Sequence, residues 1–451
     1  EQFINDLILL VEDGEVSMSR INDAVRKILK LKFELDLFNK PVTNYQDYPK
    51  FGSNESIKLA YESASESITL LKNNNSILPL KKDAKILITG PNANSMRTLN
   101  GAWTYNWQGK HTDMYIDGVP SSLINTAQKQ GNFESKLIKD NLKPKPFNTI
   151  YEAFLKKFGK NNISFIEGVS YENDGNYHHM SEINIKKVIE AAKYHDYILL
   201  CLGENTYTEK PGDLNDLNLH KLQLKLAKEL SSCGKPIILV LNLGRPRIIS
   251  QIESDMAAII NIYLPGNSGA DALVDIVSGD INPSGKLPYS YPAFPNALAP
   301  YFHKPSESLD WFQGAYDYSG KLVQLYPFGY GLSYTNFEYK DIAIENDSIN
   351  ADDSLNLSLT VYNSGDVDGQ EVVQVYVSDL FASITPDNKR LRAFDKVFIK
   401  SGESKKLFFS IPAKDFSFVN LENKYVVESG DFTVHVGRNS KDLTSLNFFV
   451  R

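Results

Sequence analysis

Cysteine, long apolar runs and blocks of positive charge are all scarce in this 451-residue chain, and each scarcity excludes a class of protein. The two cysteines, Cys201 and Cys233, form neither a disulfide framework nor a zinc-binding pattern, and their apolar neighbours predict core packing. No apolar run reaches the roughly 18 residues that a membrane-spanning helix needs. The net charge of -7 is mild, which argues against a nucleic-acid partner.

The length and composition of the chain predict several folded domains. The length predicts two to four domains, and the 42% of hydrophobic residues can bury sizeable cores. Aromatic residues are plentiful, with 24 Tyr and 24 Phe, which suits either a sugar-binding surface or β-rich domains. His178 and His179 lack a third ligand at metal-site spacing, so we expect no metal site.

The first 40 residues predict helices that lack a packing partner. Residues 19–38 place apolar side chains at helical spacing, and residues 1–17 predict a helix that ends at a turn around Gly14. Two helices without a sheet cannot form a core, and the first residues, "EQFINDLILL", contain neither an initiator Met nor a signal peptide. We therefore expect this chain to be the downstream part of a longer protein. Residues 41–55 are polar, contain Pro and Gly, and predict a linker.

Residues 56–290 predict a mixed α/β domain. A helix is expected at 56–72, and continuous apolar strands then alternate with helices, which indicates a mainly parallel sheet covered on both faces. The strands are expected at 85–90, 195–203, 235–244 and 256–266, and the helices at 148–158, 181–193, 220–233 and 268–278.

Two further regions follow this domain. Residues 291–337 are rich in Pro, Tyr and Gly without periodicity, and predict a connecting arm. Residues 338–451 alternate apolar and polar side chains between Gly, Asn, Asp and Ser, which predicts a seven-stranded antiparallel β-sandwich.

The candidate chemistry lies in two loops. Glu204 and Glu209 follow a buried strand in "CLGENTYTEKPGD", and a carboxyl pair could split a glycosidic bond, although their spacing fits a solvated acidic turn equally well. Trp103 and Trp107 lie in the polar loop "NGAWTYNWQG", where an exposed indole can stack on a sugar ring or simply pack. The segment "ILITGPNAN" lacks the second and third glycines of a dinucleotide site.

A series of segments in order along the chain resembles glycoside hydrolase family 3, in particular its three-domain β-glucosidases. The segments are "ESITLLKNNNSILPL", "KILITGPNAN", "GAWTYNWQG", "LGENTYTEKPGD", "NLGRPRII", "NPSGKLPYSYP", "YPFGYGLSYTNFEY" and "SITPDNKRLRAFDKV". The resemblance implies the last helices of a truncated (β/α)8 barrel at 1–40, an α/β sandwich, and a fibronectin type III-like domain.

The same resemblance implies the roles of individual residues. Glu204 is the expected acid/base, with Glu209 as the alternative, and Trp103, ahead of Trp107, is expected beside an outer sugar subsite. The family's nucleophile lies on the barrel, and this chain has no residue for that role, so the chain alone is expected to be inactive.

The implied activity is that of a retaining exo-acting β-glucosidase without a metal or cofactor. The expected partners are β-linked oligosaccharides or glucosides, with no nucleic acid and no membrane. A homodimer is a possible oligomeric state. β-Xylosidase is the enzymatic alternative, and a non-catalytic carbohydrate-binding or scaffold protein is the alternative of another class. Family members of this type predict a periplasmic or extracellular location.

Overall fold

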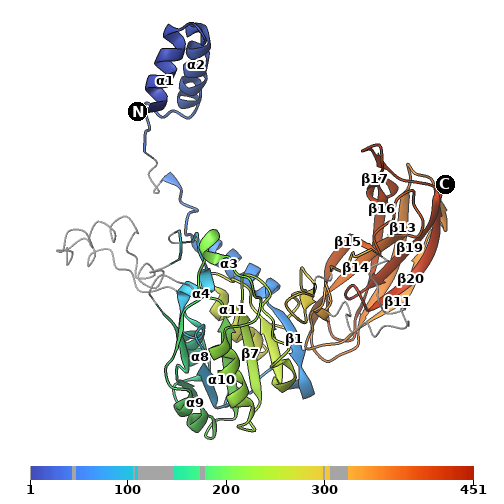
Figure 1. Cartoon of the computed structure of the whole chain (residues 1–451). Coiled ribbons are helices and arrows are strands. Elements are labelled where there is room, and N and C mark those ends of the chain that lie inside the picture. The colour runs from blue at the N-terminus through green and yellow to red at the C-terminus, as the bar shows by residue number, and fades with distance from the viewer. Residues whose placement is uncertain are drawn as a thin grey trace, which may run out of the picture. The chain divides into compact units, whose positions relative to one another are not determined.

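The computed structural model describes residues 2–42, 47–104, 107–109, 147–172, 178–297, 300–304 and 324–451 (Figure 1). The chain divides into two compact units, Glu1–Leu59 and Ala60–Arg451. Parts of the predicted arm and of the tryptophan loop lie outside the described residues. No helix among the described residues combines the length and the apolar character needed to span a bilayer.

The first unit contains the two helices that the sequence predicts. Helix α1 spans Gln2–Glu12, and α2 spans Met18–Glu34. The Ser17 side chain caps α2 by accepting a hydrogen bond from the Arg20 backbone N–H. Neither helix contains a buried residue, and the large apolar side chains of both are open to solvent.

The second unit contains a six-stranded sheet in the order β1-β8-β7-β6-β2-β3. Its strands are β1 (Thr69–Asn73), β2 (Ile86–Thr89), β3 (Ile163–Phe165), β6 (Tyr197–Gly203), β7 (Ile237–Asn242) and β8 (Ala258–Asn261). The strands from β8 to β3 run parallel, as predicted, whereas β1 pairs antiparallel with β8 at the edge. The predicted helix 56–72 is therefore wrong in its last turn, because α3 (Asn54–Ser67) ends before β1 begins.

Helices cover both faces of this sheet and make three layers. One apolar cluster joins the sheet to α4 (Met96–Asn100), α8 (Ile150–Phe158) and α11 (Gly269–Ser278). The other cluster joins the opposite face to α9 (Ile185–Ala192) and α10 (Lys221–Ser231). Each of the last four helices agrees with a predicted helix to within a few residues. A short hairpin, β4 (Val169–Tyr171) with β5 (Met180–Glu182), was not predicted.

The C-terminal residues form a β-sandwich of a three-stranded and a five-stranded sheet. The first sheet has the order β11-β13-β16 and the second β12-β20-β19-β14-β15. Their strands are β11 (Phe337–Ile344), β12 (Ser348–Ile349), β13 (Ser354–Asn363), β14 (Gly369–Asp379), β15 (Arg390–Ile399), β16 (Ser404–Pro412), β19 (Gly430–Gly437) and β20 (Leu443–Val450). The prediction of seven antiparallel strands is wrong in one detail, because the two-residue β12 adds a parallel pairing with β20.

The described part of the arm is held against the α/β domain. It contributes β9 (Tyr291–Pro292), paired with β10 (Gln324–Tyr326), and Leu332 bridges to Leu70 of β1. The backbones at Gly285 and Gly331 also pack closely, because a Cβ at Gly331 would lie 2.1 Å from the Gly285 carbonyl oxygen. Gly285 of "PSGKLP" and Gly331 of "PFGYGLSYT" thus lie where the backbone packs closely.

Candidate active-site loops

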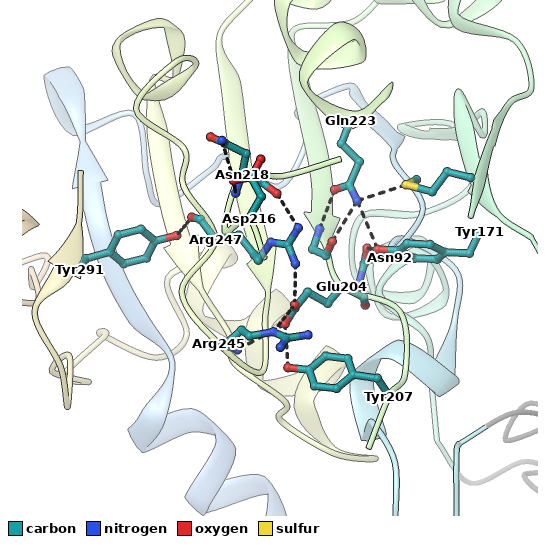
Figure 2. A network of polar contacts seen from close by, with 12 residues as sticks. Asn92, Tyr171, Glu204, Tyr207, Asp216, Asn218, Gln223, Arg245, Arg247 and Tyr291 are labelled. Atoms are coloured by element: carbon teal, nitrogen blue, oxygen red, sulfur yellow. Dashed lines mark hydrogen bonds and ion pairs between the residues drawn. The ribbon is translucent and has the colours of Figure 1, made fainter. Parts of the chain in front are cut away.

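Three neighbouring parallel strands, β2, β6 and β7, end at the same edge of the sheet, and the loops that follow them build the candidate site (Figure 2). Open α/β sheets usually carry their sites at this edge. The loops meet closely because Gly203 has no side chain: a Cβ there would lie 2.0 Å from the Asn242 carbonyl oxygen. The residue before Glu204 is therefore restricted to glycine by its neighbour's backbone.

A buried amide network fixes the start of the loop after β6. Asn92 and Asn242 are both fully buried, and Asn92 Nδ2 donates to Asn242 Oδ1 at 3.0 Å and to the Glu204 carbonyl at 3.2 Å. Gln223 of α10 bonds both backbone groups of Gly203, each at 2.9 Å. The Tyr171 hydroxyl donates to Asn92 Oδ1 at 2.9 Å. These bonds satisfy polar groups that would be costly to bury alone, and they hold the loop in one position.

The Glu204 side chain lies at the centre of a clamp of donors from the loop after β7. Its Oε1 accepts from Arg245 Nε at 2.8 Å and from Arg247 Nη1 at 3.0 Å. Its Oε2 accepts from the Tyr207 hydroxyl at 3.1 Å and from the Arg245 backbone N–H at 3.3 Å. Figure 2 shows both guanidinium groups directed at this carboxylate. With a side chain only 3% exposed, Glu204 is enclosed by its partners.

The clamp is itself supported on its outer side. Arg247 donates to the Asn218 carbonyl, and the buried Tyr291 hydroxyl donates to the Arg247 carbonyl at 2.6 Å. The Arg245 guanidinium lies 4.1 Å from the centre of the Tyr207 ring, a cation–π contact. The Tyr207 ring leaves no room at Gly212, where a Cβ would lie 2.4 Å from it. The loop therefore folds around Tyr207 as a rigid unit.

Glu209 has the opposite environment. It is exposed, and its φ of 54° places it in the left-handed region at the start of a short 3-10 turn, Lys210–Gly212. Among the described residues, none forms a hydrogen bond or ion pair with its carboxylate. The two glutamates, of which the family resemblance placed Glu204 first as acid/base, thus differ sharply, Glu204 being enclosed and Glu209 open to solvent.

Both candidate tryptophans are exposed in a loop that adjoins the glutamate loop. Trp103 is 66% exposed and Trp107 50%, with ring centres 6.5 Å apart and a backbone hydrogen bond between them. The base of this loop touches the glutamate loop, because a Cβ at Gly109 would lie 2.8 Å from Thr206 Cβ. The core-packing alternative is disfavoured for both indoles, and the arrangement offers two aromatic faces beside the loop that carries Glu209.

The sequence reasoning did not assign roles to Arg245, Arg247 or Tyr207. The available signal was the segment "LGRPRII", in which two arginines follow directly on a fully buried strand end. His195 has a structural role, because its ring nitrogens bond the Ala191 carbonyl and the Ser164 hydroxyl. Within the described ranges, no group of three or more His, Cys, Asp and Glu side chains is arranged to hold a metal ion.

Comparison with known proteins places these loops in a family. Residues 68–334 match the model of the glycosyl hydrolase family 3 C-terminal domain, and residues 371–440 match a fibronectin type III-like domain. A lysosomal β-glucosidase of Dictyostelium discoideum is 33% identical over 96% of this chain and 50% of its own length. A β-xylosidase of Formosa agariphila is 32% identical over 96% of this chain and 56% of its own length.

Solved structures give the same result. A β-glucosidase from Listeria innocua in complex with glucose superimposes with a TM-score of 0.78 at 29% identity, over 98% of this chain and 56% of that one. The chain spans about half the length of the curated relatives it matches. Since the family model covers more than half of the chain, the chain belongs to glycoside hydrolase family 3, of which it carries the C-terminal α/β domain and a fibronectin type III-like domain.

Proposed function

We propose that this chain is the C-terminal part of a retaining exo-acting β-glucosidase, and that Glu209 is its acid/base. The observation that carries the proposal is an exposed carboxylate on a rigid loop at the sheet edge, beside two exposed tryptophans. β-Glucosidases among the similar proteins support the substrate class; the Listeria innocua enzyme has been solved with glucose and, as a variant, with laminaribiose.

The contacts of the two glutamates favour Glu209 over Glu204 for this role. A general acid must reach the leaving-group oxygen at about 2.6–3.2 Å and carry a proton to give it. The Glu204 carboxylate accepts from two guanidinium groups and its side chain is 3% exposed, so a leaving-group oxygen cannot reach it in this arrangement. Glu209 is open to a ligand, and the Glu204 clamp holds the loop on which it lies. We assign Glu204 a positioning role.

The mechanism then uses one carboxyl group from this chain and one from outside it. Glu209 protonates the glycosidic oxygen while a carboxylate of another domain attacks the anomeric carbon, forming a covalent glycosyl-enzyme and releasing the aglycone. Glu209 next deprotonates a water, which attacks the same carbon and frees the sugar with net retention. The two carboxyl groups need a separation of about 5–5.5 Å for this double displacement.

The first unit supports the need for a further domain. The large apolar side chains of α1 and α2 are exposed, with Phe3 at 77% and Phe33 at 69%. Apolar faces of this size normally pack against another surface. We propose that they belong to the barrel domain that carries the nucleophile. A non-catalytic sugar-binding protein would instead keep these faces polar, which is the feature that separates the two hypotheses.

β-Xylosidase is the second candidate, because relatives named as β-xylosidases match this chain nearly as well as those named as β-glucosidases. The two substrates differ by one hydroxymethyl group. Trp103 and Trp107 can stack on either sugar, so the choice depends on contacts from the rest of the site. Relative kcat/KM on aryl β-glucosides and aryl β-xylosides decides between the two.

The test of the proposal is carried out on the complete protein and on variants of it. Glu209→Gln is expected to lower kcat most for glucosides with poor leaving groups, which need protonation, and least for the glycosylation step of activated aryl glucosides. Azide, which needs no general base, should rescue deglycosylation in Glu209→Gln and yield the β-glycosyl azide. Glu204→Gln should reduce activity similarly on both substrates, without azide rescue. Azide rescue of Glu204→Gln instead of Glu209→Gln would return the acid/base role to Glu204.

A further inference from the structure

A hollow in the fibronectin type III-like domain, remote in sequence from the glutamate loop, is lined by Arg392, whose guanidinium forms no ion pair in the described part of the chain. It has a volume of about 420 Å³, within the roughly 300–1,000 Å³ range of small-molecule sites. The ends of β14 and β15 form one wall, with Asp379 and Arg392. The hairpin of β17 (Phe418–Val419) and β18 (Tyr425–Val426) forms the other.

Arg392 occupies an irregular position in its strand. Leu391 of β15 pairs with Tyr376 of β14, whereas Ala393 pairs with Val375, so Arg392 is an extra residue without a partner in the ladder. A β-bulge of this kind bends the strand and redirects a side chain, and bulges are common beside functional sites. Here the bulge places Arg392 among the lining residues of the hollow.

The Arg392 guanidinium has no counter-ion within the described part of the chain. Its Nε is buried and lacks a hydrogen-bond partner, and no carboxylate lies within ion-pair distance. Burial lowers the pKa of Arg392, with the nearby Arg390 adding to the effect. An unpaired guanidinium that is partly removed from water is costly, and a carboxylate ligand would relieve that cost by bidentate pairing.

The other charges of the hollow select a singly charged ligand. Lys304 and Arg390 share Asp387, at 2.9 and 2.5 Å, so these two cations already have a partner. Asp379 adds a second carboxylate to the lining. Among the lining residues, three cations and two carboxylates leave one positive charge, and Asp415 nearby also acts on Arg392, which matches a single carboxylate and not a dianionic phosphate.

The walls of the hollow suit a sugar ring. Phe418 and Tyr425 line it on the hairpin side, and Tyr425 is 81% exposed. An aromatic face packs on the C–H face of a pyranose, while Asp379 can accept hydrogen bonds from ring hydroxyls. Carboxylate, hydroxyls and a pyranose ring occur together in one class of ligand.

We propose that this hollow is a second carbohydrate site, which binds a hexuronic acid residue with its carboxylate on Arg392. The site lies in the last domain and does not depend on the roles of Glu204 and Glu209. In the complete protein it would retain acidic polysaccharide near the catalytic domain. Free uronic acid and a uronic acid residue in a polymer present the same chemistry to Arg392.

The test measures equilibrium binding of D-glucuronate, D-glucose and acetate to the full 451-residue chain by calorimetry. Glucuronate should bind, with glucose and acetate at least about tenfold weaker, because neither offers both carboxylate and ring. Arg392→Gln should weaken glucuronate at least about tenfold. The matched control Arg451→Gln removes the same charge from an exposed arginine of the same domain, whose side chain bonds only Ser348 among the described residues. It should leave the affinity unchanged.

The remaining outcomes decide the proposal as well. Equal glucuronate affinity in Arg392→Gln and the parent overturns it, and acetate binding as tight as glucuronate reduces the hollow to an anion site. Should Arg392→Gln lose its fold by circular dichroism, the exposed Tyr425→Ala takes its place and should weaken glucuronate severalfold. An unchanged affinity there overturns the proposal too. Comparing free glucuronate with a glucuronate-containing oligosaccharide then distinguishes monosaccharide from polymer binding.

Discussion

Replacing Glu204 by Gln tests whether the arginine clamp stabilises the α/β domain. The change keeps the size of the side chain but removes the charge that faces Arg245 and Arg247. Removing one partner of a buried ion pair costs about 3–5 kcal/mol, because the remaining charges stay buried without compensation. The Glu204 side chain is 3% exposed, but Arg245 is 26% and Arg247 11% exposed, so water partly screens the arginines. We therefore expect the lower end of that range, about 3 kcal/mol.

For a domain of this size, a loss of about 3 kcal/mol lowers Tm by roughly 6–12 °C. The matched control is Glu209→Gln, five residues further on, where an exposed carboxylate without a described partner should change stability by less than about 0.5 kcal/mol. Both variants and the parent are compared by far-UV circular dichroism during heating and in urea. If Glu204→Gln melts within about 2 °C of the parent, the clamp does not stabilise the loop, and the positioning role of Glu204 fails with it.

Three further predictions concern other parts of the second unit. Gly203→Ala should destabilise the α/β domain by about 1–3 kcal/mol in urea unfolding, because the new Cβ would lie 2.0 Å from the Asn242 carbonyl oxygen. Lys286→Met should lower the free energy of unfolding by about 3–5 kcal/mol, because it leaves the buried Glu371 carboxylate without its cation. The Glu371 side chain is 3% exposed and lies 3.2 Å from Lys286 Nζ. An effect no larger than that of an exposed Lys→Met control would contradict this. His435 has a pKa lowered from 6.5 to about 4 by burial, so between those pH values the unfolded chain binds the extra proton and stability falls as pH falls. From pH 7 to pH 5 that loss should be at most about 2 kcal/mol, because solvent partly screens the side chain, and His435→Gln should remove it; an equal loss in the variant would place its origin elsewhere.

Most of the fold could be predicted because its signals are local. The strands β2, β6, β7 and β8 are continuous apolar runs bounded by Gly, Asn or Asp, and the sandwich strands alternate with period two. The edge strand β1 could not be separated from the helix before it. Its sequence, "TLLKN", continues the apolar spacing of α3, and only the long-range pairing of Leu70 with Ile260 decides its conformation.

The sequence analysis expected Glu204 ahead of Glu209, and the different surroundings of the two could not be predicted for a similar reason. Both occur in one polar loop, and nothing within that loop distinguishes their surroundings. The residues that do so, Arg245 and Arg247, lie 41 and 43 positions after Glu204. Parallel pairing of β6 with β7 brings the two loops to the same edge of the sheet, and that pairing is a property of the tertiary structure.

The contrast between the two carboxylates follows from where each lies along the loop. At the strand end the chain is surrounded by β2 and β7, so a charge placed there must be paired, and pairing it with two arginines makes the loop rigid. Five residues on, Glu209 is exposed, and its φ of 54° lies in the left-handed region. A general acid needs apolar surroundings or a neighbouring negative charge to keep its proton near neutral pH. The Glu209 carboxylate is exposed in the described part of the chain, so we propose that the domain that brings the nucleophilic carboxylate also covers Glu209.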